Sequence, residues 1–192
     1  WHVYRSPAQA RSLGGIQSTE RPETGRWYAF RIEHDGDRYR WLVDGVVVAD
    51  FREPNLVAGS GGLVSLATSG PQADYDDVSV VSLESQGDVS PNFIQNASFE
   101  KVYDIVPFAW KPTGISTIPP ERFWARWGVD TNTFWHGRQS LKMVSGEKES
   151  AGFQCHQTGM PVGRPCTFSV YLKADRPDLR ARLMYFEYPS GP

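Results

Sequence analysis

The chain has 192 residues, of which 40% are hydrophobic, 13% aromatic and 22% charged, and its formal net charge is −2. A chain this rich in apolar and aromatic side chains can bury a sizeable core, which excludes a disordered protein. The near-neutral charge, without a basic stripe, argues against nucleic acid or anionic lipid as a partner. No apolar run approaches the roughly 20 residues that span a bilayer, so no membrane span is predicted.

The first 83 residues show the apolar–polar alternation of antiparallel strands, with no convincing helix. Tyr28, Phe30 and Ile32 alternate with polar or small residues, which predicts a strand with one buried face. Asp44-Gly45 is a strong hairpin signal between two further strands. The strands expected around and after this hairpin are 39–43, 46–49, 63–67 and 75–81.

The order of these motifs resembles the C-terminal half of a concanavalin A-like or laminin G-like jelly roll. The resemblance covers residues 25–83 and is carried by the segments that start at Trp27, Trp41, Gly62 and Tyr75. It implies a fold rather than an activity. In relatives an acidic residue on the last strand helps to hold a structural calcium ion, so Asp77 is a candidate ligand; a solvated carboxylate at the strand edge is the alternative.

Residues 84–91 are polar and rich in turn-forming residues, as expected of a linker. A second pattern starts with Asn92–Glu100, which we interpret as the first strand of a second module. Within it, Asn96-Ala97-Ser98 fits an N-glycosylation sequon. Further strands are expected at 140–144, 153–158, 167–173 and 181–188.

This second half is similar to the family 4 and family 9 type of carbohydrate-binding module. The resemblance runs from residue 92 to about 188 and rests on four segments: Asn96–Glu100, Phe108–Trp110, His136–Met143 and Thr167–Ala174. It implies a galactose-binding-like jelly roll, polysaccharide as the partner, and a structural Ca²⁺ to which Glu100 would contribute. Ala97 and Cys166 depart from the family pattern.

Aromatic side chains are the candidates for sugar contact, because their faces stack on the apolar faces of pyranose rings. The densest clusters are Phe123–Trp127 and Phe134–His136. We expect Trp124, Arg126 and Trp135 to contact ligand and Trp110 and Trp127 to lie in the core. Core packing is the competing interpretation for each tryptophan.

Two cysteines, Cys155 and Cys166, flank a predicted turn, so either a disulfide or two separate buried thiols fits the spacing. The four histidines are scattered, and no hydrolase, zinc-protease or phosphate-loop motif is present. No active site is visible in the sequence.

The sequence therefore predicts an all-β chain of two consecutive antiparallel β-sandwich (jelly-roll) modules, incomplete at both ends: residues 1–83, a linker 84–91, and residues 92–192. The expected function is non-catalytic polysaccharide binding within a secreted or cell-surface carbohydrate-active protein, whose other modules are its partners. One alternative is part of a concanavalin-like glycoside hydrolase or lyase whose catalytic residues lie outside this sequence. The other is a pair of structural or adhesion spacers.

Overall fold

Strands make up all the regular secondary structure in the part of the chain described by the computed structural model. The described residues are 2–4, 12–15, 23–52, 61–69, 72–83, 92–103, 106–113, 127–144, 150–157, 165–176 and 180–188. The all-β prediction is confirmed. No helix long and apolar enough to cross a membrane occurs in these ranges.

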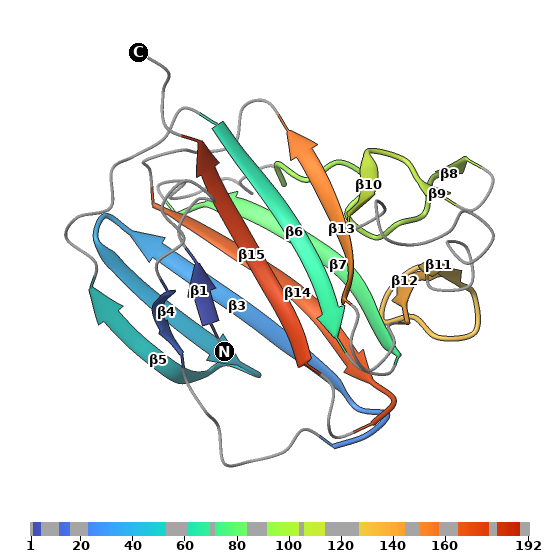
Figure 1. Ribbon diagram of the computed structural model, residues 1–192, viewed down its shortest axis with the longest axis horizontal. Coiled ribbons are helices and arrows are strands. Elements are labelled where there is room, and N and C mark those ends of the chain that lie inside the picture. Colours follow the sequence, from blue (N-terminus) through green and yellow to red (C-terminus); the bar gives the residue numbers. More distant parts are fainter. Residues whose placement is uncertain are drawn as a thin grey trace.

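The strands form two large antiparallel sheets and two small ones (Figure 1). The seven-stranded sheet has the order β11-β12-β7-β14-β3-β4-β5, and the four-stranded sheet has the order β10-β13-β6-β15. The remaining strands pair as β1-β2 and β8-β9. The bounds are β1 His2–Tyr4, β2 Ser12–Gly15, β3 Trp27–Asp35, β4 Arg38–Val43, β5 Val46–Arg52, β6 Gly61–Ser69, β7 Ala73–Ser82, β8 Val102–Tyr103, β9 Val106–Pro107, β10 Trp110–Thr113, β11 Trp127–Asp130, β12 Ser140–Met143, β13 Ser150–Gln157, β14 Cys166–Ala174 and β15 Arg180–Tyr188.

Strands from both sides of the predicted linker share both large sheets. In the seven-stranded sheet β14 lies between β7 and β3, and in the four-stranded sheet β6 lies between β13 and β15. Figure 1 shows the four-stranded sheet crossing in front of the seven-stranded one. The sheets therefore do not divide at residues 84–91, and the number of modules stays a prediction.

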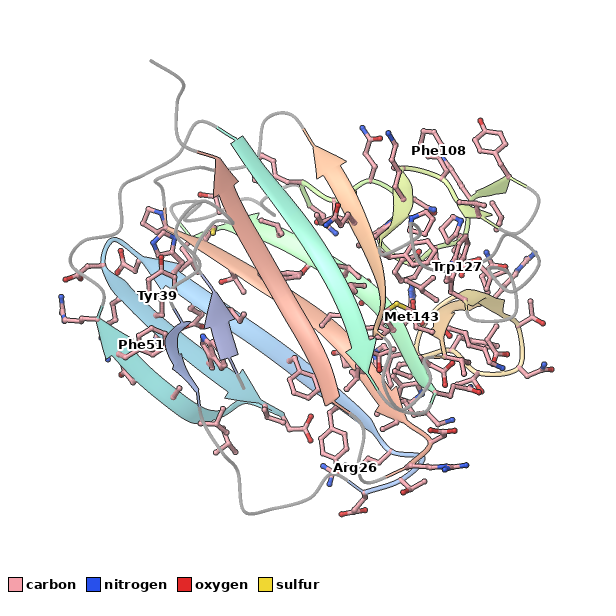
Figure 2. The ribbon with its side chains drawn as sticks, viewed as in Figure 1. Arg26, Tyr39, Phe51, Phe108, Trp127 and Met143 are labelled. Atoms are coloured by element: carbon pink, nitrogen blue, oxygen red, sulfur yellow. The ribbon has the colours of Figure 1, made fainter. Side chains whose placement is uncertain are left out.

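The core lies between the two large sheets. Strand β14 shows why, because Phe168, Val170 and Leu172 alternate with more polar residues and are buried in the main apolar cluster. From the four-stranded sheet, Phe153 of β13 packs edge to face against Trp127, with 4.6 Å between the ring centroids (Figure 2 labels Trp127). Trp110 and Trp127 are buried, as predicted from the sequence.

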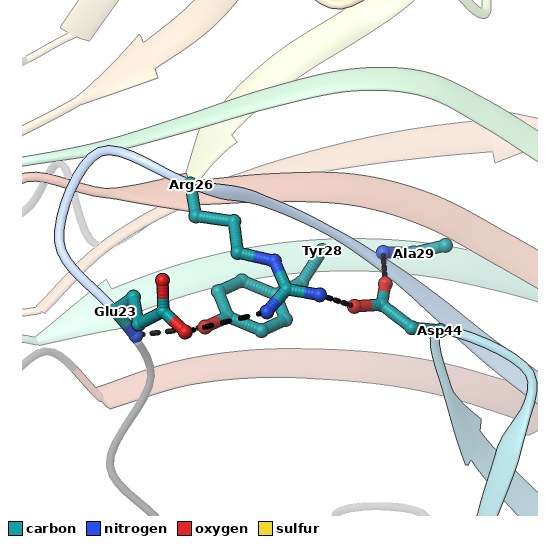
Figure 3. Close-up of polar contacts among 5 residues, drawn as sticks. All are labelled: Glu23, Arg26, Tyr28, Ala29 and Asp44. Carbon is teal, nitrogen blue, oxygen red and sulfur yellow. Dashed lines mark hydrogen bonds and ion pairs between the residues drawn. The ribbon is translucent and has the colours of Figure 1, made fainter.

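The Asp44-Gly45 hairpin between β4 and β5 is confirmed. Asp44 has φ 49° and Gly45 φ 81°, the two positive values that a type I′ turn requires. Figure 3 shows how the turn is tied to β3: Asp44 Oδ1 accepts the Ala29 N–H at 2.8 Å, and Asp44 Oδ2 pairs with Arg26 at 2.7 Å. The Arg26 guanidinium also lies over the Tyr28 ring, 4.7 Å from its centroid.

The strand predicted at Asn92–Glu100 is wrong, because this segment forms turns. Asn96 and Phe99 have φ values of 51° and 62°, which an extended strand cannot contain. The segment lies along β7, where the Asn92 side chain accepts the Val80 N–H at 3.0 Å and donates to Val78 O at 2.9 Å. The side-chain amide of Asn92 thus pairs with backbone groups of β7, although the segment does not form a strand.

Asn96 uses its whole side-chain amide in hydrogen bonds to the backbone of nearby segments. Its Nδ2 donates to Lys101 O at 2.8 Å and Phe108 O at 3.0 Å, and its Oδ1 accepts the Lys101 N–H at 2.8 Å. A glycan on Nδ2 would replace one of these two donors, so the sequon at Asn96 is incompatible with this structure.

The two cysteines are not joined by a disulfide. Cys155 lies on β13 in the four-stranded sheet and Cys166 on β14 in the seven-stranded sheet, and both are buried. Of the two interpretations left open by the sequence, separate buried thiols is the one observed.

Candidate functional site

Three aromatic rings meet on the outer face of the seven-stranded sheet, the face turned away from the four-stranded sheet. Tyr171 belongs to this face because its neighbours Val170 and Leu172 point into the core. The Trp135 ring lies parallel to the Tyr171 ring, with centroids 4.4 Å apart and planes 15° apart. Trp27, at the start of β3, packs edge to face against Trp135, with 6.4 Å between the ring centroids. We call these three residues the aromatic cluster.

Trp135 is the most exposed member of the aromatic cluster. It retains 49% of its accessible surface, although its ring is stacked on Tyr171, whereas Tyr171 and Trp27 are half-buried. A large apolar ring that is held in place yet half exposed is a candidate contact for ligand. The structure therefore places this predicted ligand residue at the surface.

Charged side chains lie in one row next to the aromatic cluster. The register aligns Lys142 of β12 with Asp74 of β7, Asp74 with Lys173 of β14, and Lys173 with Trp27 of β3. Lys142 also pairs with Asp130 Oδ2 at 3.6 Å. The row could offer hydrogen-bond donors and acceptors to a polar ligand lying on the rings.

Asp74 and Asp130 are the carboxyl groups in this row that a catalytic interpretation would use. Burial, and then the charge of Asp130, raise the pKa of Asp74 to about 6, against a hydrogen bond from Gln72 that lowers it. An elevated carboxyl pKa is typical of a general acid. However, Asp74 is only 2% exposed, so it cannot reach a substrate in this conformation.

Trp135 is carried by the loop of residues 131–139, between β11 and β12, and two carboxylates hold this loop. Asp76 Oδ2 accepts the N–H groups of Trp135 and His136 at 2.8 and 2.9 Å. Glu100 Oε1 accepts those of Arg138 and Gln139 at 2.8 and 3.3 Å. Hydrogen bonds to a carboxylate therefore hold the loop on both sides of Gly137.

The other predicted site residues have different outcomes. Trp124 and Arg126 lie outside the described residues. Asp77 is half-buried in β7, with φ 48°, where the register with β14 shifts. Glu100 uses one oxygen for the backbone of the 131–139 loop, and no three His, Cys, Asp or Glu side chains gather as a metal site in the described ranges. The calcium-binding roles of Asp77 and of Glu100 stay separate predictions, each resting on the resemblance of its own half of the chain.

Sequence reasoning missed Tyr171, Trp27 and the role of Asp76. A signal was present for the two aromatic residues: each occupies the polar phase of an alternating strand, next to neighbours expected in the core. For Asp76 the signal was absent, because its partners are 59 and 60 residues away in the sequence.

No family model matches the chain, and no curated protein matches it.

Proposed function

We propose that this protein binds polysaccharide without catalysis, and that Trp135 and Tyr171 form the surface on which a sugar ring rests. The observation that carries the proposal is the half-exposed Trp135 ring, stacked on Tyr171 and bordered by Trp27. Aromatic faces bind the apolar faces of sugar rings, and polar side chains nearby bond the hydroxyl groups.

Residues around the aromatic cluster supply suitable polar groups. Lys142 keeps 37% of its side chain exposed, and Lys173 stands beside Trp27 across the β14–β3 pair. Asn132 and His136, on the 131–139 loop, are also exposed. Together these side chains provide donors and acceptors beside an apolar ring, the combination that sugar recognition needs.

The setting that we propose follows from the family resemblance described above. The chain would act within a secreted or cell-surface protein of several modules and would bring the other modules to a polysaccharide. A site that only adsorbs glycan fits this role, because it needs an accessible aromatic surface rather than a reactive group.

The test is affinity electrophoresis of the protein in gels that contain soluble neutral or uronic-acid polysaccharides, one per gel. We expect at least one polysaccharide to retard the protein, and Trp135→Ala to weaken the retardation about tenfold, as for a central aromatic contact. Tyr103→Ala is the matched control, because Tyr103 is an aromatic residue on β8 with 72% of its surface exposed. Retardation by none of the polysaccharides, or equal loss in both variants, would overturn the proposal.

A further inference from the structure

The carboxylate of Asp76 joins two parts of the site. Its Oδ2 accepts the N–H groups of Trp135 and His136, and its Oδ1 accepts the N–H of Asp77 at 2.8 Å. Asp77 directly follows Asp76 in β7, where the register with β14 shifts next to the Asp76–Tyr171 pair. One buried side chain thus fixes both the sheet below Tyr171 and the loop that places Trp135 above it.

The burial of Asp76 restricts the position of the 131–139 loop. The residue is 0% exposed, and burying a carboxylate is unfavourable unless hydrogen-bond donors surround it. Burial raises the pKa of Asp76, and its three backbone N–H partners lower it. If the 131–139 loop moved away, Oδ2 would lose two of these donors, so the loop position is strongly preferred.

Glu100 holds the far side of the loop next to Gly137, where a side chain would displace its carboxylate. Gly137 has φ +80°, and a Cβ atom on it would lie 2.2 Å from Glu100 Oε1. Nearby, the Gln139 side chain donates to Phe99 O at 2.6 Å. The turn at Gly137 therefore lets the Glu100 carboxylate approach the backbone of Arg138 and Gln139.

We infer that Asp76 and Glu100 are positioning residues of the glycan site: they hold the 131–139 loop so that Trp135 is already stacked on Tyr171 before ligand binds. This inference rests on the proposed function and deepens it. A site that is ordered in advance loses less conformational entropy on binding, so affinity depends on residues that never touch the sugar. It also gives Glu100 a role in the described structure that involves backbone amides.

The first test is a double-mutant cycle between Asp76→Asn and Trp135→Ala, read by affinity for the best-retarding polysaccharide. Asparagine has the shape of aspartate but a single acceptor oxygen, so it cannot accept both the bonds from the 131–139 loop and the bond from the Asp77 N–H. We expect Asp76→Asn to weaken binding severalfold in the natural background and to have no further effect once Trp135 is alanine. A purely structural role would lower affinity equally in both backgrounds.

The second test compares Gly137→Ala with Gly45→Ala. Both glycines have nearly the same φ, +80° and +81°, so alanine introduces the same backbone strain at each. A Cβ on Gly45 meets nothing within 4 Å, whereas one on Gly137 meets Glu100 Oε1. We expect only Gly137→Ala to weaken glycan binding, although both lower the melting temperature.

The outcomes separate the inference from the proposed function. If Trp135→Ala weakens binding but Asp76→Asn and Gly137→Ala do not, the positioning role is wrong and the glycan site stands. If no polysaccharide binds, the proposed function fails first. In that case, acrylamide quenching of tryptophan fluorescence still tests the loop: Asp76→Asn should raise quenching in the natural chain but not in the Trp135→Phe background. Equal quenching with and without Asp76→Asn would overturn the positioning role.

Discussion

The indole ring of Trp135 rests on the phenol ring of Tyr171, with 4.4 Å between the ring centroids, although the two residues lie far apart in the sequence. Tyr171 is directly opposite Asp76 in the β14–β7 pair, and the Asp76 carboxylate holds the backbone of Trp135. Trp135, Tyr171 and Asp76 are thus adjacent in space. Substitutions of Tyr171 and Asp76 should therefore change ligand binding through their effect on Trp135.

Tyr171 should contribute to binding through its ring rather than its hydroxyl group. A stacked aromatic pair is worth about 0.5–1.5 kcal/mol beyond the area it buries. We therefore expect Tyr171→Ala to weaken polysaccharide binding several times over, while Tyr171→Phe, which keeps the ring, binds as the natural protein does. Isothermal titration of each variant measures this, and a loss in Tyr171→Phe as large as in Tyr171→Ala would contradict it.

Asn96 should be essential for folding stability. Its Nδ2 donates to two backbone carbonyls and its Oδ1 accepts one N–H. Asn96→Asp keeps the shape but faces those carbonyls with an acceptor in place of a donor, and each hydrogen bond lost costs about 0.5–1.5 kcal/mol. We expect a clearly lower midpoint in urea unfolding. Gln95→Glu, an equivalent change at the exposed neighbouring position, is the control and should shift the midpoint little.

The turn of the β4–β5 hairpin should depend on Asp44 more than on its ion pair with Arg26. Asp44 Oδ1 accepts the Ala29 N–H, whereas the Arg26 side chain is half exposed, and such surface pairs are worth about 0–1 kcal/mol. We expect Asp44→Ala to destabilise the protein by about 1–2 kcal/mol, since it also loses a residue suited to positive φ. Arg26→Ala should cost less than Asp44→Ala, and the reverse order in chemical unfolding would contradict this prediction.

Local patterns in the sequence predicted the strands well. The alternation of Phe168, Val170 and Leu172 predicts which side chains are buried, and Asp44-Gly45 predicts a hairpin, because both depend on neighbours along the chain. The prediction for Asn92–Glu100 was wrong: Ile94 and Phe99 are buried in the core, but Asn92 and Asn96 bond backbone groups through their side chains and the segment forms turns. Periodicity alone does not show that competition.

Pairing between distant strands was beyond prediction from this sequence. Placing β14 between β7 and β3 depends on which sheet edges meet, and alternating strands fit several partners equally well. The contacts within the candidate site could not be predicted for the same reason. Trp135 could be proposed because it lies in a cluster of aromatic residues, but its contact with Tyr171 and the hydrogen bonds from its loop to Asp76 follow only from the sheet order.

Asp74 should make the protein less stable as the pH rises. Burial raises the pKa of this carboxyl to about 6 from a reference value of 3.8, so between these values the folded state keeps a proton that the unfolded state has lost. The resulting stabilisation is complete below about pH 4 and is lost as the pH rises through about 6, with an upper limit of about 3 kcal/mol. Asp74→Asn cannot titrate here. The free energy of unfolding of the natural protein, minus that of Asp74→Asn, should therefore fall between pH 4 and pH 7 in urea titrations; a constant difference would show that Asp74 titrates alike in both states.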